Sequence, residues 1–333
     1  MIRCLAADGP RHPLEPFSYE PAPLGPLDVE VEITHCGICH SDVHLINDDW
    51  DIGRYPLVPG HEIIGSVAAL GSNVAGLKRG QRVGIGWQRS ACGACEWCLS
   101  GFDNLCPRSE ATCVHHYGGF AERIRADSRY CFPVPEALPS ETAAPLLCGG
   151  ITVYSPLRHY GVHAGMRLGV VGIGGLGHLA LQYARAFGCE VTAFSSTPAK
   201  ADEARRLGAH RFVVSTDRKA MEKAAGSQDF MLNTVSADID WPAFLKSLRP
   251  NGTLCLVGVA PGDLQVSPDE LIGGQKTICG SAIGGRARIA EMLEFSARHG
   301  IQARVEVVPM AEANRAVEKV EKNLARYRMV LRN

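Results

Sequence analysis

The chain has almost no net charge and no long uninterrupted apolar run. Its 34 Lys and Arg residues balance 35 Asp and Glu residues, which leaves a formal net charge of −1 and a sequence pI of about 6.9. A balanced surface creates no strong field that would favour nucleic acid or anionic lipid. We therefore expect no nucleic-acid partner. Low-complexity segments and fixed-period repeats are also absent, so nothing favours a disordered or solenoid architecture.

The first residues lack the features of a secretory signal. Residues 1–16 contain no apolar core and no small-residue cleavage site, so we expect no signal peptide. The most apolar stretch, residues 165–188, is broken by glycines and polar side chains and is a poor membrane span. The 13 cysteines then indicate metal ligation and free thiols, not a disulfide framework. A cytoplasmic protein without a membrane partner is the default expectation.

The length and texture of the chain predict two domains. A chain of 333 residues exceeds one ordinary core. Residues 1–150 contain short alternating or β-branched runs punctuated by Gly and Pro, which predicts an irregular, largely antiparallel β domain. After residue 150, six apolar runs alternate with helix-like segments, which predicts an α/β domain with a doubly wound, six-stranded parallel sheet.

The last fifty residues do not continue this β–α alternation. They contain a helix-like stretch at 286–299, a strand at 304–308, a second helix at 310–322 and a final strand-like run. We expect this tail to return to the first domain. The expected domains are therefore residues 1–150 with 285–333, which form one discontinuous domain, and residues 151–284.

Four closely spaced cysteines form the strongest local motif. Three of them are separated by two residues each, and the fourth follows eight positions later: Cys92, Cys95, Cys98 and Cys106. Thiolates at this spacing suit a tetrahedral zinc ion, and four protein ligands leave no open position, so the site should be structural. Four unrelated buried thiols and an iron–sulfur cluster are the alternatives.

A glycine-rich turn follows the first strand of the second domain. The segment G-I-G-G-L-G matches G-x-G-x-x-G and opens a helix, the context that dinucleotide binding requires. Its glycines permit a tight turn and close approach of the backbone to a pyrophosphate, which the helix amino terminus then binds. The expected cofactor contacts are Gly172, Gly174, Gly175, Leu176 and Gly177. A βα turn without a ligand is the alternative.

The end of the second strand favours NADP(H) over NAD(H). NAD-binding proteins usually carry an acidic residue here for the ribose 2′-hydroxyl, and this chain has none. It has Ser195, Ser196 and Thr197, followed by Lys200. Hydroxyls and a cation suit a 2′-phosphate, which a carboxylate would repel. The nearby Arg205 and its neighbour are expected on a solvated helix face.

Three further motifs contain residue types that bind catalytic metals. C-G-I-C-H-S-D spans residues 36–42, G-H-E spans residues 60–62, and L-L-C-G-G surrounds Cys148. One His and two Cys could hold a zinc ion with an open fourth position. Spacing alone, however, leaves these residues too scattered to assign to one ion. A His beside a Glu, or a single Cys, is equally consistent with ordinary packing.

Taken together and in this order, the motifs resemble those of the zinc-dependent medium-chain dehydrogenase/reductase family. The resemblance runs through nearly the whole chain and is strongest with the cinnamyl alcohol dehydrogenase branch, in particular its bacterial NADP-dependent broad-range aldehyde reductases. PLVPGHEIIG, PLLCGGITVYSP and VGIGGLGHLA carry it, together with the closing RYRMVL. It implies a GroES-like catalytic domain beside a Rossmann domain.

The resemblance also implies a catalytic zinc site. Its ligands would be Cys39, His61 and Cys148, a Cys₂His set for which alcohol dehydrogenase is the standard example. Glu62 resembles a carboxylate that can approach the zinc, and Asp42 resembles the partner that orients the ligand imidazole. With the quartet, two zinc ions per chain are expected.

Ser41 and His44 resemble the two members of a proton relay. Zinc lowers the pKa of a bound alcohol, so Ser41 could accept the proton and His44 could pass it toward solvent. Ser41 could instead cap the helix that starts near His40, and His44 could be an ordinary surface residue. We interpret His115 and its neighbour as loop residues.

Further cofactor contacts and a homodimer are also expected. Thr152 resembles a residue beside the nicotinamide, and Arg328 resembles a cofactor-phosphate contact. Val257 and Ser281 are expected to contact the cofactor as well. Trp50, Trp87 and Ile283 are candidate walls of the substrate pocket, although ordinary packing explains them nearly as well.

The predicted function is NADP(H)-linked interconversion of primary alcohols and aldehydes by hydride transfer. Apolar pocket walls would favour aliphatic or aromatic aldehydes, including cinnamyl-type ones. An NAD-linked polyol dehydrogenase is an alternative of the same class. A non-catalytic redox sensor that binds zinc and nucleotide and uses its spare thiols is an alternative of a different class.

Overall fold

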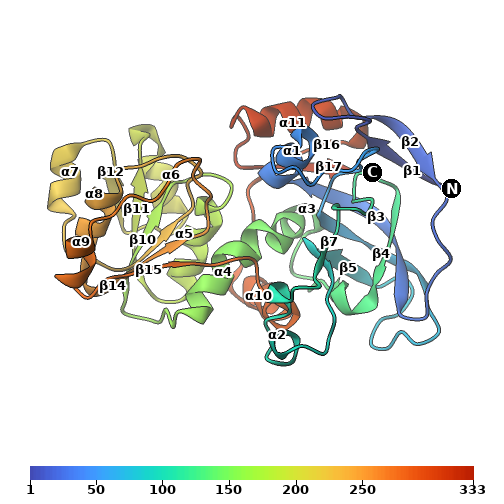
Figure 1. Cartoon of the computed structure of the whole chain (residues 1–333), viewed down its shortest axis with the longest axis horizontal. Coiled ribbons are helices and arrows are strands. Elements are labelled where there is room, and N and C mark those ends of the chain that lie inside the picture. The colour runs from blue at the N-terminus through green and yellow to red at the C-terminus, as the bar shows by residue number, and fades with distance from the viewer. The chain divides into compact units, whose positions relative to one another are not determined.

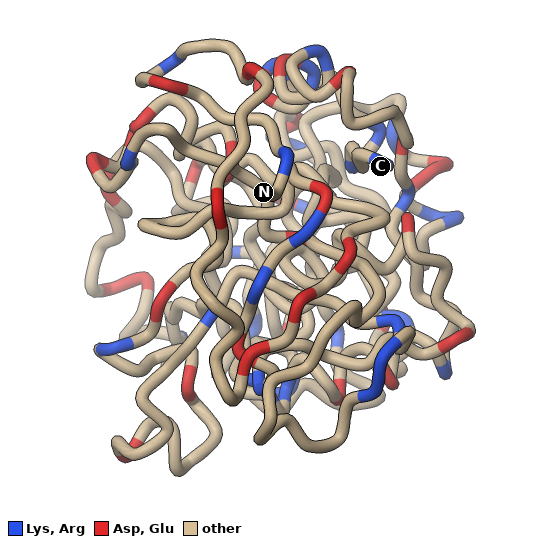
Figure 2. The backbone as a smooth tube through the Cα atoms, turned by 90° about the vertical axis from the view of Figure 1, so that its right-hand side faces the viewer, with Lys and Arg blue, Asp and Glu red and all other residues tan.

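A computed structural model describes every residue from Met1 to Asn333. The chain folds into two compact units (Figure 1): residues 1–151 with 284–333 form unit 1, and residues 152–283 form unit 2. No helix combines the length and the apolar composition that crossing a membrane requires. Basic and acidic positions are interspersed along the backbone (Figure 2), in keeping with the near-zero net charge.

Unit 1 is built around a seven-stranded sheet. Its strand order is β16-β17-β3-β4-β5-β9, and β8 also pairs with β3. Only the β16–β17 pair is parallel. Two small sheets, β1-β2 and β6-β7, complete the β structure. The strands are β1 (Ile2–Ala6), β2 (Glu15–Tyr19), β3 (Asp28–Ile38), β4 (Glu62–Leu70), β5 (Arg82–Ile85), β6 (Gln88–Ser90), β7 (Glu110–Ala111), β8 (Arg123–Asp127), β9 (Phe132–Pro133), β16 (Val305–Pro309) and β17 (Arg328–Arg332).

Short helices lie between these strands. The closing strand β17 pairs antiparallel with β3, so the carboxyl-terminal tail completes the sheet that the early strands begin. The helices of unit 1 are α1 (His40–Asn47), α2 (Glu96–Leu99), α3 (Ser140–Ala143), α10 (Arg286–His299) and α11 (Ala313–Glu321), with 3-10 turns η1 (Asp103–Leu105), η2 (Ser128–Tyr130), η3 (Ala144–Leu147) and η5 (Met310–Glu312). Helix α4 (Gly149–His159) begins in unit 1 and continues into unit 2.

The pairing of β3 with β4 brings distant motifs together. Both strands are rich in β-branched residues, and Val29, Val31 and Ile33 of β3 are buried in the core. The strands run antiparallel with Gly37 opposite Glu62, so the end of β3 lies beside the start of β4. Residues 39 and 61, which flank these strand ends, therefore become neighbours. Turn η3 packs against the same sheet and ends immediately before Cys148.

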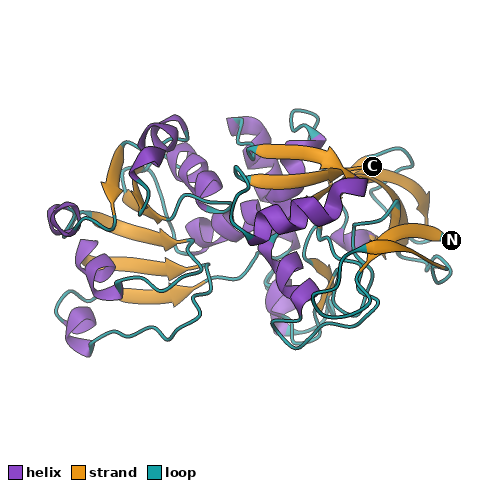
Figure 3. Cartoon of the chain, turned by 90° about the horizontal axis from the view of Figure 1, so that it is seen from above, coloured by secondary structure: helices purple, strands orange, loops and turns teal.

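Unit 2 contains a six-stranded sheet in the order β12-β11-β10-β13-β14-β15. All neighbouring strands are parallel, and helices flank them (Figure 3). This confirms the predicted doubly wound sheet. The elements are β10 (Arg167–Val171), α5 (Gly177–Ala186), β11 (Glu190–Ser195), η4 (Pro198–Lys200), α6 (Ala201–Arg206), β12 (Arg211–Val214), α7 (Arg218–Lys223), β13 (Gln228–Asn233), α8 (Trp241–Ser247), β14 (Leu248–Leu256), α9 (Pro268–Ile272) and β15 (Thr277–Gly280).

Several element boundaries differ from the sequence prediction. Strand β14 begins at Leu248 and therefore includes Pro250 and Asn251, residue types that are typical of turns. Asn251 indeed has a φ of 63°, and the pairing of β13 with β14 shifts register there. The predicted helix at 310–322 is a 3-10 turn followed by α11.

We predict that Gly177→Ala destabilises unit 2, whereas Gly174→Ala does not. A Cβ at residue 177 would lie 1.9 Å from the carbonyl oxygen of Gly172, and only a backbone shift could relieve this contact. A Cβ at residue 174 would meet no heavy atom within 4 Å. Overpacking of this kind costs about 1–3 kcal/mol, so thermal unfolding should give a lower Tm for Gly177→Ala. Equal Tm values for the two variants would contradict this packing role.

Candidate functional site

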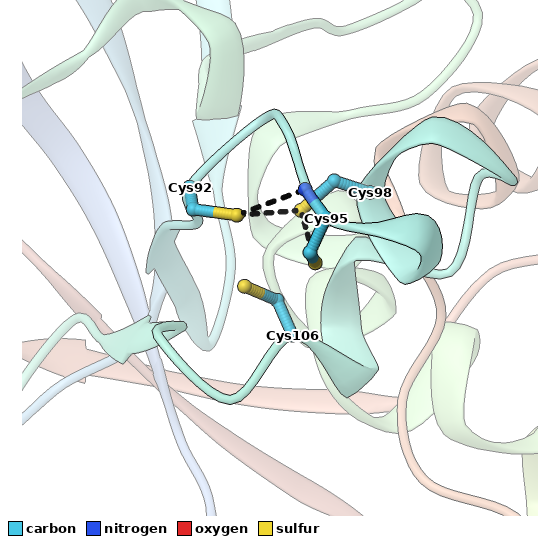
Figure 4. Close-up of side chains that lie close together, drawn as sticks. All are labelled: Cys92, Cys95, Cys98 and Cys106. Atoms are coloured by element: carbon cyan, nitrogen blue, oxygen red, sulfur yellow. Dashed lines mark hydrogen bonds between the residues drawn. The ribbon is translucent and has the colours of Figure 1, made fainter.

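The four cysteines of the quartet lie in one cluster of unit 1 (Figure 4). Their sulfur atoms are all within 4.8 Å of one another. The Cys92 and Cys98 sulfurs are 3.8 Å apart, and the Cys95 and Cys98 sulfurs are 3.6 Å apart. Two sulfurs bound to one tetrahedral zinc at 2.3 Å would be separated by about 3.8 Å. The cluster therefore fits a single zinc ion with four protein ligands.

Backbone N–H groups point at these sulfurs. Ala94 and Cys95 donate to Cys92 Sγ at 3.4 and 3.3 Å, and Arg108 donates to Cys106 Sγ at 3.4 Å. These bonds stabilise thiolates, and the Ala94 and Cys95 N–H groups lower the pKa of the Cys92 thiol to about 5. Gly93 has a φ of 70°, which allows the tight turn that directs both N–H groups at one sulfur. The loop is thus built to hold thiolates.

A second cluster brings together the three scattered motifs. Cys39, His61, Glu62 and Cys148 offer ligand atoms that lie within 4.8 Å of one another. The Cys39 and Cys148 sulfurs are 3.8 Å apart, again the separation expected across a tetrahedral zinc. His61 and Glu62 are completely buried. The expected ligands 39, 61 and 148 are therefore close enough to share one ion.

The imidazole of His61 supplies an independent test of fit. Its Nε2 atom is buried and has no hydrogen-bond partner within the protein. A buried polar atom without a partner is costly, and a metal ion between Nε2 and the two sulfurs would satisfy it. The opposite nitrogen, Nδ1, lies 2.9 Å from Asp42 Oδ1. This arrangement leaves Nε2 as the ligand atom, as in other metal-bound histidines.

Asp42 holds several parts of this cluster in place. Its carboxylate is fully buried and accepts hydrogen bonds from the backbone N–H groups of Cys39 at 2.8 Å and Gly60 at 2.9 Å, in addition to the His61 contact. Cys39 is the residue that caps the amino terminus of α1. One carboxylate therefore positions both a sulfur ligand and the imidazole ligand.

The geometry of Cys39 Sγ and Cys148 Sγ also allows a hydrogen bond that places one proton between the two sulfurs. This bond between the sulfurs lowers the pKa of the Cys39 thiol and raises the pKa of the Cys148 thiol. A zinc ion would have to displace this proton, because only thiolates bind zinc. Nearby, the Glu62 carboxylate pairs with Arg328. Burial raises the pKa of Glu62 to about 7, although Arg328 opposes the shift.

The expected relay residues lie at the same end of α1. Ser41 Oγ is 3.6 Å from Cys39 Sγ. Because Cys39 caps the helix and Ser41 makes no capping bond, the alternative role of Ser41 as the helix cap is wrong. His44 is partly exposed, and its Nδ1 lies 2.7 Å from Asp49 Oδ2. A carboxylate thus orients the His44 ring, and the part of His44 in a relay stays a prediction.

Two candidate wall residues lie beside these groups. The ring of Trp87 meets His61 edge-on with ring centres 4.9 Å apart, and Trp50 lies 6.4 Å from Trp87. Trp50 also stacks near His44 at 5.0 Å. These contacts place aromatic surface next to both His61 and His44. Ile283 belongs to unit 2.

The expected coenzyme residues lie at the carboxyl ends of the parallel strands in unit 2. The turn after β10 contains the glycines, and Leu176 is the residue that caps α5. Ser195 ends β11, and its hydroxyl accepts a hydrogen bond from the Thr197 N–H at 3.2 Å. The Lys200 ammonium group donates to the carbonyl of Ile173 at 2.7 Å, which holds it beside the glycine turn. Ser196 is exposed.

The other residues that we expect to contact the cofactor lie on separate elements, outside the glycine turn. Val257 and Ser281 follow β14 and β15, and Thr152 lies in α4. Arg328 is buried in unit 1 and binds Glu62. Its expected contact with a cofactor phosphate stays a prediction.

Sequence reasoning missed three neighbours of the metal cluster. Cys113 is completely buried with its sulfur 4.0 Å from His61 Nδ1. The pairing of Arg328 with Glu62, and of Asp49 with His44, was also unforeseen. Cys113 carries no local motif. Asp49 lies five residues after His44, just past the end of α1, and this spacing was the one available signal.

Comparisons with known proteins agree with this geometry. Residues 25–136 match the alcohol dehydrogenase GroES-like domain, and residues 175–298 match the zinc-binding dehydrogenase family. The chain is 44% identical to the aldehyde reductase AdhA of Synechocystis sp. over 331 residues, which cover 99% of this chain and 98% of that protein. It is also 44% identical to the probable cinnamyl alcohol dehydrogenase 3 of Oryza sativa subsp. japonica over 335 residues, covering 98% and 91%.

Solved structures give the same result. A cinnamyl alcohol dehydrogenase from Sorghum bicolor superimposes with a TM-score of 0.95 at 40% identity, covering 99% of this chain and 97% of the other. A cinnamyl alcohol dehydrogenase from Helicobacter pylori, complexed with NADP(H), superimposes with a TM-score of 0.92 at 33% identity and the same coverage.

The chain therefore belongs to the zinc-dependent medium-chain dehydrogenase/reductase family, whose GroES-like and zinc-binding dehydrogenase domains it contains. Within this family it is an alcohol dehydrogenase/aldehyde reductase, similar to aldehyde reductases and cinnamyl alcohol dehydrogenases. The resemblance drawn from the motifs and the predicted pair of folds are both confirmed.

We predict that the purified protein contains about two zinc ions per chain. A substitution in one cluster should remove the ion of that cluster and leave the other ion bound. Cys98→Ser and Cys148→Ser should each retain about one zinc, because each removes one thiolate from a different cluster. Elemental analysis after dialysis measures the content. Cys36→Ser is the matched control, since Cys36 is buried near the second cluster but belongs to neither. A wild-type content of one zinc would contradict a two-ion protein.

Proposed function

We propose that this chain is a two-zinc, NADP(H)-linked aldehyde reductase that interconverts primary alcohols and aldehydes. The observation that carries the proposal is the cluster of Cys39, His61 and Cys148, in which the unpartnered, buried Nε2 of His61 faces two sulfurs beside Ser41. Three protein ligands leave a fourth position open to substrate. The names of the relatives, aldehyde reductase and cinnamyl alcohol dehydrogenase, support the same reaction. A homodimer, measurable by light scattering, is part of the proposal.

A zinc ion in this cluster would act as a Lewis acid toward the substrate oxygen, and the nicotinamide would carry the hydride. The residues of the chain supply position and proton transfer. Asp42 fixes the imidazole orientation through Nδ1. Ser41 would exchange a proton with the substrate oxygen, and His44 would exchange it with solvent. Asp49 would hold the His44 ring with Nδ1 toward its carboxylate.

The surroundings favour an apolar substrate. Trp50 and Trp87 lie beside His44 and His61 and offer aromatic surface. Aromatic side chains stabilise flat or aliphatic groups by burial and stacking. We therefore propose aliphatic or aromatic aldehydes, including cinnamyl-type ones, as substrates in preference to polyols. An NADPH-oxidation assay over an aldehyde panel tests this, and activity limited to polyols would contradict it.

Coenzyme preference follows from the residues near the glycine turn. Lys200 is held against this turn, and Ser195, Ser196 and Thr197 precede it without any acidic side chain. A 2′-phosphate could accept hydrogen bonds from these groups, whereas NAD(H) has only a hydroxyl at this position and offers the ammonium group no phosphate charge. The similar cinnamyl alcohol dehydrogenase from Helicobacter pylori was solved as a complex with NADP(H), which supports this choice.

We predict that NADPH is used with a higher kcat/KM than NADH and that Lys200→Ala reduces this preference. A hydrogen bond to a charged group contributes about 1.5–3 kcal/mol, so the ratio of the two kcat/KM values should fall roughly 10- to 100-fold. Arg205→Ala is the matched control. Its guanidinium pairs with Asp202 on an exposed helix face, so the ratio should not change. Equal or better use of NADH by the wild type would defeat the proposal.

We predict that Ser41→Ala lowers turnover by on the order of 10²-fold while the zinc content and Tm stay unchanged. General acid–base groups contribute at least this much to proton transfer, and Ser41 makes no capping bond whose loss would destabilise α1. Steady-state kinetics and elemental analysis measure both quantities. Ser41→Thr keeps a hydroxyl and should restore much of the turnover. Full activity in Ser41→Ala would remove Ser41 from the relay.

A further inference from the structure

Two cysteines outside both metal clusters face each other in unit 2. Cys255 lies near the end of β14 and Cys279 near the end of β15, strands that Figure 1 labels at one side of the parallel sheet. The two residues are paired directly in the strand register, so their side chains share one face of the sheet. Neighbouring strands lie about 4.8 Å apart. This spacing falls within the Cα separations of about 4.4–6.8 Å that disulfides span.

The two thiols have different surroundings. Cys255 is completely buried, whereas Cys279 is partly exposed on the outermost strand of the sheet. A hydrogen bond from the Cys255 thiol lowers the pKa of the Cys279 thiol to about 7, and the Tyr160 side chain contributes in the same direction. Tyr160 is itself anchored by its hydroxyl, which donates to the Gly280 carbonyl at 2.7 Å. Cys279, the partly exposed residue of the pair, is thus the one whose thiol ionises more readily.

A metal site does not explain this pair. Neither cysteine belongs to a group of three or more potential ligands, unlike the sulfurs of both clusters in unit 1. The remaining chemistry of two adjacent thiols, one partly exposed and ionised and one buried, is reversible oxidation.

We propose that Cys255 and Cys279 form a dithiol that hydroperoxides oxidise to a disulfide across β14 and β15. The Cys279 thiolate attacks the peroxide, so that an S–O bond forms, the O–O bond breaks and one water or alcohol leaves. The Cys255 sulfur then attacks the sulfenic acid at Cys279, so that the S–S bond forms and a second water leaves. Two thiols are oxidised by two electrons, and one peroxide is reduced. A thiol reductant reverses the reaction.

Peptide mapping of the zinc-loaded protein tests the proposal directly. The protein is treated with a small molar excess of hydrogen peroxide, its remaining thiols are blocked with N-ethylmaleimide, and it is digested with trypsin without reductant. Trypsin cuts after Lys276, so the two cysteines fall in separate peptides, residues 247–276 and 277–286. The expected product is one cross-linked species two hydrogens lighter than the sum of the peptides. Dithiothreitol should separate it.

Three variants sharpen this test. Cys279→Ser and Cys255→Ser should both abolish the cross-link, and Cys255→Ser should leave Cys279 to oxidise further to sulfinic acid. Cys189→Ser is the matched control, because Cys189 is a buried thiol of the same unit whose sulfur bonds a backbone carbonyl instead of another thiol. The cross-link should persist in Cys189→Ser.

A reactivity measurement distinguishes the pair from ordinary buried thiols. Burial raises the pKa of Cys189 to about 11, so N-ethylmaleimide should label Cys279 at least about tenfold faster at neutral pH. The proposal is overturned if the two peptides stay unlinked while other thiols are oxidised. It is equally overturned if Cys279 is linked only to Cys279 of a second chain.

Discussion

The buried carboxylate of Asp42 is the interaction on which the catalytic cluster depends. It accepts hydrogen bonds from the N–H groups of Cys39 and Gly60 and contacts the His61 imidazole. A carboxylate without these donors would be expensive to bury. The same donors fix the start of α1 and the loop before β4, which position the ligand sulfur and the ligand nitrogen. Folding of the sheet and geometry of the metal cluster are thus coupled through one side chain.

The sequence could predict features whose parts lie close together in the chain. The quartet of cysteines spans only residues 92–106, so their spacing alone indicates a closed metal site. The glycine turn likewise needs only a strand, six residues and a helix. In both cases the local backbone determines the geometry, and the structure places the sulfurs at the separations that zinc requires. Alternation of apolar runs with helix-like segments also predicted the parallel sheet, because neighbouring parallel strands need a crossover connection that is usually a helix.

The catalytic cluster could not be assembled from spacing. Residues 39 and 61 meet only because β3 and β4 pair antiparallel, and residue 148 joins them through the packing of η3 on that sheet. The resemblance to the family predicted that these three residues bind one ion, and the short distances between them support that prediction. Resemblance did not supply Cys113, nor the pairing of Arg328 with Glu62. These contacts join residues 52 and 266 positions apart, and such separations carry no local pattern. Burial and charge neutralisation determine such contacts after the fold has formed.

Outside the quartet, the chain contains two pairs of neighbouring cysteines, Cys39 with Cys148 and Cys255 with Cys279, and the surroundings of each pair favour different chemistry. Beside Cys39 and Cys148 lies an imidazole nitrogen without a partner, so a cation that displaces the shared proton gains three ligands at once. Beside Cys255 and Cys279 lies the hydroxyl of Tyr160, which is a poor ligand for zinc. Two sulfurs alone hold zinc weakly, whereas two sulfurs suffice for a disulfide. The presence or absence of a third ligand is therefore our reason for proposing Lewis-acid chemistry in unit 1 and thiol oxidation in unit 2.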